Sequence, residues 1–123
     1  MTKRAVSGVL VASLIALTIA AVGHAASSTT LQLKADPNGR LRYNMTTLTA
    51  KAGKVTIVMS NPSSSHLKHG IAVQGNGVDK DGKVVPAGKT STLTVTLKPG
   101  KYTFYCNFDG HKKLGMKGTL TVK

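Results

Sequence analysis

Hydrophobic and polar residues alternate along much of the chain after residue 30, with the period of two that is typical of β-strands. The alternation is cleanest at residues 92–97, where Leu93, Val95 and Leu97 share one face and threonines occupy the other. Shorter alternating or β-branched segments predict further strands. They lie at residues 31–34, 41–49 (a looser stretch), 55–59, 69–73, 84–86, 101–106 and 119–122.

Turn-forming residues separate these segments. Asp36-Pro37-Asn38-Gly39 and Asn61-Pro62 end strands, and residues 75–83 form a polar, glycine-rich stretch that we expect to be a loop. Because the turn at residues 98–100 is short, we expect segments 92–97 and 101–106 to pair antiparallel. The sequence shows no sustained helical period and no internal repeat. It therefore predicts an all-β, antiparallel Greek-key sandwich or barrel of about seven to eight strands.

The first 25 residues have the character of a targeting segment. Lys3 and Arg4 precede an apolar run at residues 5–22, and Gly23-His24-Ala25 follows it. This order predicts a signal peptide, residues 1–25, removed after Ala25. The alternative is a retained membrane anchor at residues 5–22, because roughly 18 apolar residues can just span a bilayer. Either way we expect one domain, residues 26–123, in the periplasm or elsewhere outside the cytoplasm.

Charge and cysteine content narrow the function. Residues 26–123 carry a formal charge of about +11, with four Asp and no Glu. A basic surface of this size favours an acidic docking face on a protein partner or an anionic envelope surface. Export and the few aromatic residues argue against nucleic acid. Cys106 is the chain's one cysteine, so it cannot form an internal disulfide, and metal ligation would protect it.

Metal-binding side chains are concentrated in one short stretch. Residues 105–116 contain Cys106, His111 and Met116 with the spacing C-x4-H-x4-M. Two histidines, one cysteine and a weak axial methionine are the donors of blue-copper electron-transfer sites. His69 is the candidate for the second imidazole, because the alternation points it inward together with Ile71 and Val73. His66 lies in a polar loop, where we expect it to be exposed.

The segment His69-Gly70-Ile71-Ala72-Val73, followed later by residues 105–120, resembles the small blue copper proteins of the cupredoxin family. It is similar to plastocyanin and azurin, and the ligand-loop spacing is closest to auracyanin-type members. The resemblance implies one copper ion with His69, Cys106 and His111 as equatorial ligands and Met116 as the axial ligand. It also implies reversible one-electron transfer with redox protein partners, which would dock near the exposed edge of His111.

The chain departs from that family's pattern at two positions. Gly70 stands where relatives often have an asparagine whose side chain ties the two ligand loops together. The Gly70 N–H could still donate to the Cys106 sulfur. Asp109 stands where relatives often have proline. Such contacts around the ligands tune a metal site.

Other functions fit the residues less well. A Cys106–His111 hydrolase would need an orienting residue and an oxyanion site, and no such context accompanies them. Zinc is disfavoured, because a thioether is a poor zinc ligand and structural zinc sites favour several thiolates. We therefore expect a monomeric electron carrier and not an enzyme, with membrane contact if the leader is retained. A copper storage or delivery module with the same ligands is the alternative.

Overall fold

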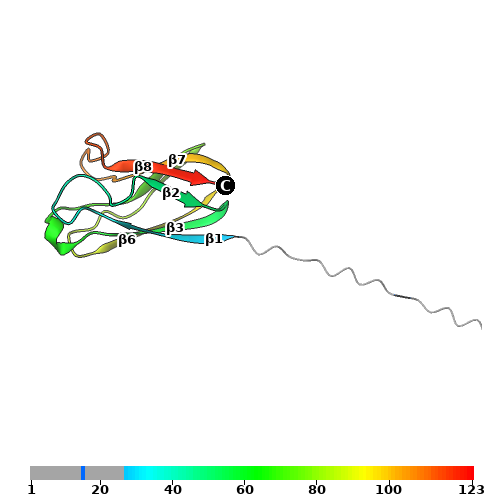
Figure 1. Ribbon diagram of the computed structural model, residues 1–123, viewed down its shortest axis with the longest axis horizontal. Coiled ribbons are helices and arrows are strands. Elements are labelled where there is room, and N and C mark those ends of the chain that lie inside the picture. The colour runs from blue at the N-terminus through cyan, green and yellow to red at the C-terminus, as the bar shows by residue number, and fades with distance from the viewer. Residues whose placement is uncertain (1–14, 16–26) are drawn as a thin grey trace, which may run out of the picture.

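The computed structural model describes Ile15 and residues 27–123. These residues form a two-layered β-sandwich with one short 3-10 helix, η1 (Figure 1). The all-β class predicted from the alternation is confirmed. The elements are β1 (Ser28–Lys34), β2 (Thr47–Ala50), β3 (Gly53–Ser60), η1 (Ser63–Ser65), β4 (Ala72–Gly75), β5 (Val78–Asp81), β6 (Thr90–Leu97), β7 (Gly100–Tyr105) and β8 (Lys117–Val122).

The strands divide into a three-stranded sheet, in the order β1-β3-β6, and a five-stranded sheet, in the order β2-β8-β7-β4-β5. Most neighbouring strands are antiparallel, as expected. The pairs β1–β3 and β2–β8 are parallel, so each sheet is mixed. Two parallel strands run in the same direction, so a hairpin cannot join them. In this chain β2 lies between β1 and β3 in the sequence, and β3 to β7 lie between β2 and β8.

The expected hairpin between residues 92–97 and 101–106 is wrong. β6 pairs with β3, whereas β7 pairs with β4 and β8 in the other sheet. The turn therefore carries the chain across the core, and Gly100 supports this change of direction with a φ of 152°. A strand with one apolar face can neighbour another in the same sheet or face it from the opposite sheet of a sandwich. The alternation of residues therefore does not decide between these two arrangements.

The polar stretch at residues 75–83 is also not a simple loop. It contains β5, which forms a hairpin with β4 around Asn76-Gly77, both at positive φ. Asn-Gly favours this kind of tight hairpin turn. β5 lies at the edge of its sheet and is largely exposed, so it lacks the hydrophobic alternation that would reveal a strand. The strand predicted at residues 69–73 begins later than expected, at Ala72. His69 and Tyr43 lie outside the strands and pair only in isolated β-bridges.

The core lies between the sheets. Val55, Ile57 and Met59 of β3 are fully buried, as are Phe104 and Leu120 of the opposite sheet. Burying an aliphatic or aromatic side chain of this size stabilises the fold by about 1.5–3 kcal/mol. The inward faces predicted for β6 and β7 are confirmed, although Val95 remains half-buried.

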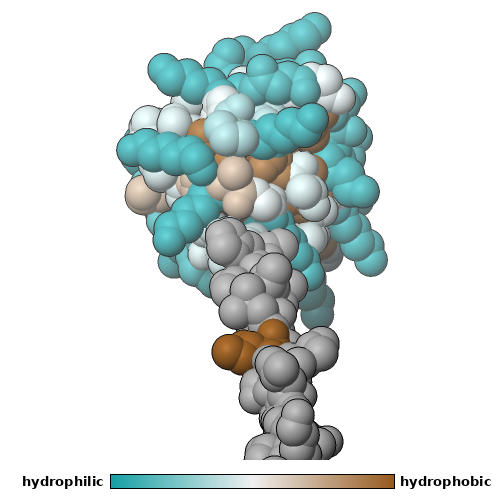
Figure 2. Space-filling view, turned by 90° about the vertical axis from the view of Figure 1, so that its right-hand side faces the viewer, coloured by the Kyte–Doolittle hydropathy of each residue, from teal (hydrophilic) through white to brown (hydrophobic). Residues whose placement is uncertain are grey.

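The two ends of the sandwich differ in character. At one end lie η1, the loop after β1 and the loop before β8, and at the other lie the C-terminus and the start of β1 (Figure 1). Hydrophilic side chains dominate the second end, with a smaller apolar area between them (Figure 2). The strand register places several exposed lysines there, namely Lys51, Lys54, Lys98, Lys101 and Lys123.

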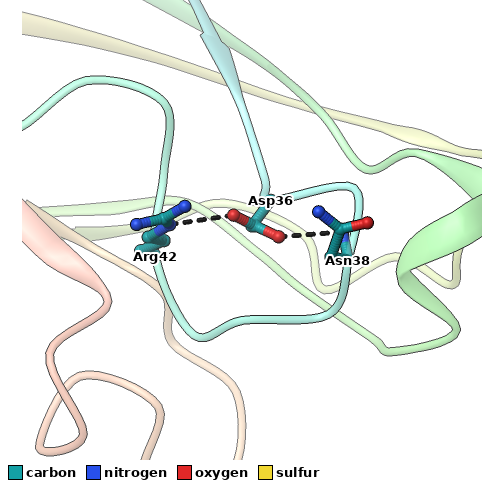
Figure 3. Close-up of polar contacts among 3 residues, drawn as sticks. All are labelled: Asp36, Asn38 and Arg42. Atoms are coloured by element: carbon teal, nitrogen blue, oxygen red, sulfur yellow. Dashed lines mark hydrogen bonds and ion pairs between the residues drawn. The ribbon is translucent and has the colours of Figure 1, made fainter.

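The loop after β1 is held by a nearly buried carboxylate. One oxygen of Asp36 accepts a hydrogen bond from the Asn38 N–H, and the other accepts from Nε of Arg42, each at 2.8 Å (Figure 3). Asp36 is 6% exposed, so both oxygens need these donors. The clip fixes the loop that leads to Tyr43.

The predicted leader lies outside the described residues except for Ile15. Within the described part of the chain, no helix is long and apolar enough to cross a membrane.

The Asp36 clip generates a pH-dependent contribution to stability. The hydrogen bond from Arg42 holds the pKa of the Asp36 carboxyl below its ordinary value of 3.8. A carboxyl whose pKa is lower in the folded state contributes stability that is complete above the unfolded pKa. That stability is lost as the pH falls through the folded pKa. We expect the melting temperature of the wild type to fall more steeply from about pH 5 to about pH 2 than that of Asp36→Asn. Asp79→Asn, which alters an exposed carboxylate of β5, should keep the wild-type slope. Equal slopes in all three proteins would contradict the prediction.

Candidate metal centre

Three predicted ligands converge at the end of the sandwich that carries η1. One ligand atom from each of His69, Cys106 and His111 lies within 4.8 Å of the others. The sulfur of Cys106 is 3.8 Å from Nδ1 of His69 and 3.6 Å from Nδ1 of His111. Both imidazoles therefore turn the same nitrogen toward one sulfur. His66 is exposed, as predicted, and is not part of the group.

Backbone pairing places His69 and Cys106 side by side. The peptide of His69 exchanges two hydrogen bonds with Val85, at 3.1 and 2.8 Å. Cys106 follows β7 directly, and β7 pairs with β4 through Ala72 and Tyr105. The last ladder pair therefore brings both ligand segments to the same sheet end.

The loop between Cys106 and β8 folds back on itself. The Cys106 N–H donates to the carbonyl of Met116 at 3.0 Å, and the Met116 N–H donates to the carbonyl of His111 at 3.1 Å. Met116, the predicted axial ligand, is fully buried, and these backbone hydrogen bonds tie its residue to Cys106 and His111. Asp109 has a φ of 44°, a left-handed conformation that proline cannot adopt. A proline at position 109 would therefore require a different backbone conformation in this loop.

Two further residues surround the group, and the sequence did not single them out. The hydroxyl of Tyr43 donates to the Gly70 carbonyl at 2.6 Å, and the side-chain amide of Asn107 donates to the Gly82 carbonyl at 3.0 Å. The Gly70 N–H donates to the sulfur of Cys106 at 3.4 Å, which confirms the predicted contact. Asn107 directly follows the cysteine, which is the one sequence signal that could have identified it.

The group is buried and nearly dry. His69 is 0% exposed and Cys106 is 1% exposed, whereas His111 keeps 6%. The ring of Phe108 meets the ring of His111 edge-on, with centroids 5.2 Å apart. Among these three candidate ligands, His111 thus has the best access to the surface.

Burial changes the acid–base behaviour of the group. It lowers the pKa of His69 to about 4, and the charge of His111 contributes in the same direction. Burial raises the pKa of the Cys106 thiol, and hydrogen bonding by the backbone of Gly70 and Phe108 opposes this shift. The neutral imidazole is the form that binds metals, whereas the thiol releases its proton when a metal binds.

The donor chemistry fits a soft transition-metal ion. One sulfur and two imidazole nitrogens converge in an apolar setting, and a thioether residue is packed beside them. This set is typical of mononuclear blue-copper sites, and it lacks the several thiolates that structural zinc sites favour. Within the described residues, Nε2 of His69 and Oδ1 of Asn107 are buried and have no hydrogen-bond partner among the protein atoms.

The surface around His111 carries exposed lysines and an exposed leucine. Lys68 and Lys113 are exposed, and Leu114 is 69% exposed. Lys112 lies 4.1 Å from the centroid of the Tyr105 ring and donates to the side chain of Gln74 at 2.7 Å.

A family model described as a cupredoxin-like domain matches residues 9–122. The chain belongs to this family. The match begins inside the segment predicted as a leader. The cupredoxin-like domain is 51% identical over 37 residues to auracyanin-B of Chloroflexus aurantiacus, a segment that covers 29% of this chain and 16% of that protein.

Solved structures share the fold. Auracyanin B superposes with a TM-score of 0.69 and 24% identity, covering 83% of this chain and 93% of its own. Reduced auracyanin of Roseiflexus castenholzii gives 0.67 and 24%, covering 80% and 99%. Auracyanin A of Chloroflexus aurantiacus, described as a "blue" copper protein, gives 0.61 and 20%, covering 79% and 100%. At these identities the likeness establishes the shared fold.

The burial of His69 in this cupredoxin-like domain is testable in the metal-free protein. We expect its ring to take up a proton only near pH 4, because burial disfavours the charged imidazolium. An NMR titration of the ring resonances measures the midpoint. His111→Gln removes the smaller cause and should leave most of the lowering in place. A midpoint for His69 at the ordinary value of 6.5 would contradict the buried placement.

Proposed function

We propose that this cupredoxin-like domain is a one-electron carrier with a single type 1 copper ion. His69, Cys106 and His111 would be the equatorial ligands and Met116 the weak axial ligand. The convergence of two Nδ1 atoms on the Cys106 sulfur, at 3.6 and 3.8 Å, carries the proposal. The bound ion would supply reversible exchange of one electron between Cu(II) and Cu(I).

The protein's part in this function is to hold the donors in place. Cys106, His111 and Met116 are linked by backbone hydrogen bonds, and His69 is paired with Val85. Donors fixed by packing and by neighbouring hydrogen bonds have little freedom to rearrange. Such a site can serve both oxidation states with small movements, which favours rapid electron exchange.

The surface near His111 suits an acidic redox partner. His111 is the ligand residue that reaches the surface, and Lys68, Lys112 and Lys113 lie nearby in the sequence and the ligand loop. Exposed Leu114 adds an apolar contact. The basic surface of the domain would attract a partner with an acidic face, and these lysines would hold it next to His111. The apolar run at residues 5–22 supports export, with the domain acting outside the cytoplasm as a monomer.

Storage or delivery of copper is the second function that the ligand set allows. Delivery requires an acceptor to reach the ion, yet His69, Cys106 and Met116 are almost completely buried. Burial therefore favours the carrier. Slow electron exchange combined with ready transfer of copper to an acceptor protein would favour the alternative.

The colour of the copper form tests the ligand set. We expect the Cu(II)-loaded protein to be intensely blue, because charge transfer from a thiolate to Cu(II) absorbs visible light. Cys106→Ser should abolish the band. Met116→Leu should keep it and raise the reduction potential, because a weak donor to Cu(II) is lost.

Two histidine variants form the matched control in the same absorption spectra. His69→Ala should remove the blue band, and His66→Ala should preserve it. A colourless copper-loaded wild type would refute the proposal. Loss of colour in His66→Ala alone would overturn the choice of ligands.

The lysines near His111 predict that the rates of reaction with anionic and cationic redox reagents respond oppositely to salt. Stopped-flow reduction by hexacyanoferrate(II) should slow by about tenfold as the ionic strength rises, because screening weakens the attraction. Oxidation by a cationic ruthenium complex should not slow. Lys68→Gln with Lys113→Gln should reduce the salt effect on hexacyanoferrate(II). Lys98→Gln with Lys101→Gln, at the opposite end, should leave most of it. If both double variants reduced the salt effect on this rate equally, the lysines near the site would have no special role.

A further inference from the structure

Gly70 is one of the residues through which the two ligand segments touch. Its N–H donates to the Cys106 sulfur at 3.4 Å, and its carbonyl accepts from the Tyr43 hydroxyl at 2.6 Å. Glycine has the greatest backbone freedom of any residue. The direction of the Gly70 N–H therefore depends on the groups that hold the rest of this residue.

Tyr43 is itself held firmly. It is 5% exposed, its ring lies 5.8 Å from that of Phe104, and its backbone is bridged to Ala35. The loop before it is clipped by the hydrogen bonds of Asp36 to Arg42 and Asn38 (Figure 3). Because ring and backbone are both fixed, the hydroxyl presents a rigid donor to the Gly70 carbonyl.

Asn107 confines Gly70 from another direction. A Cβ atom at position 70 would overlap with Oδ1 of Asn107, so the amide fills the space that a side chain there would need. The same amide donates to the Gly82 carbonyl at 3.0 Å, and the Gly82 N–H donates to the Ile71 carbonyl at 2.7 Å. The amide therefore contributes here through its donor group and its shape.

We propose that Tyr43 is a positioning residue of the metal centre, whose hydroxyl, with Asn107 packed against Gly70, keeps the Gly70 N–H directed at the Cys106 sulfur. This inference rests on the proposed function for its effect on the ion. A hydrogen bond to a ligand sulfur withdraws electron density from it, which disfavours Cu(II) and raises the reduction potential. The restraint on Gly70 itself exists with or without metal.

The restraint is tested first in the metal-free protein. Tyr43→Phe removes the hydroxyl and keeps the ring that packs on Phe104. We expect amide hydrogen exchange at Gly70, measured by NMR, to accelerate about fivefold relative to the average of the strand amides. That change corresponds to the loss of one buried hydrogen bond.

Tyr102→Phe is the matched control. Tyr102 is 3% exposed, and its hydroxyl donates to the Lys98 carbonyl at 2.8 Å, at the opposite end of the sandwich. Its loss should lower overall stability similarly without selective exchange at Gly70. Asn107→Ala provides a second variant that leaves Tyr43 untouched, and it should also accelerate exchange at Gly70.

The reduction potential is measured next on the copper-loaded variants. Tyr43→Phe should have a lower potential than the wild type, whereas Tyr102→Phe should match the wild type. Unchanged exchange at Gly70 in both Tyr43→Phe and Asn107→Ala would overturn the restraint, even if every protein were blue. Faster exchange with an unchanged potential would overturn the tuning role. A colourless wild type would instead overturn the proposed function. The exchange result would remain valid, because it is measured in the metal-free protein.

Discussion

The site depends on one constraint: the ligand segments around Gly70 and Cys106, 36 residues apart in the chain, must meet at one end of the sandwich, where the Gly70 N–H donates to the Cys106 sulfur. Closing so long a loop costs conformational entropy, which the pairing of β4 with β7 must offset. That ladder ends at Ala72 and Tyr105, immediately before the metal group. The sandwich thus delivers the histidine and the cysteine to one end as a consequence of strand register. The ligand loop then closes over them through its own backbone hydrogen bonds.

Burial determines the chemistry of the site. It keeps the imidazole of His69 neutral and excludes water from the sulfur, and it leaves His111 as the connection to the surface. Tyr43 and Asn107 restrain the backbone of Gly70, because Gly70 has no side chain that could connect the two ligand segments.

Much of the site could be predicted from the sequence because its signals are local. Alternation gave Cys106 and His69 their inward direction, and the spacing after the cysteine identified His111 and Met116. The departures concern non-local choices. A three-residue turn at 98–100 is compatible with a hairpin or with a crossing between sheets, and packing decides between them. β5 is an exposed edge strand without apolar alternation. Tyr43 reaches Gly70 across 27 residues, so nothing near it in the sequence indicates the contact.

X-ray absorption spectroscopy at the copper edge of the loaded protein tests the central claim most directly, because it counts the atoms around the ion. The account predicts one short bond to sulfur and two bonds to imidazole nitrogen, with a second sulfur at a longer distance. Cys106→Ser should remove the short sulfur bond and leave the nitrogen bonds. Copper surrounded by nitrogen and oxygen alone in the wild type would contradict the account.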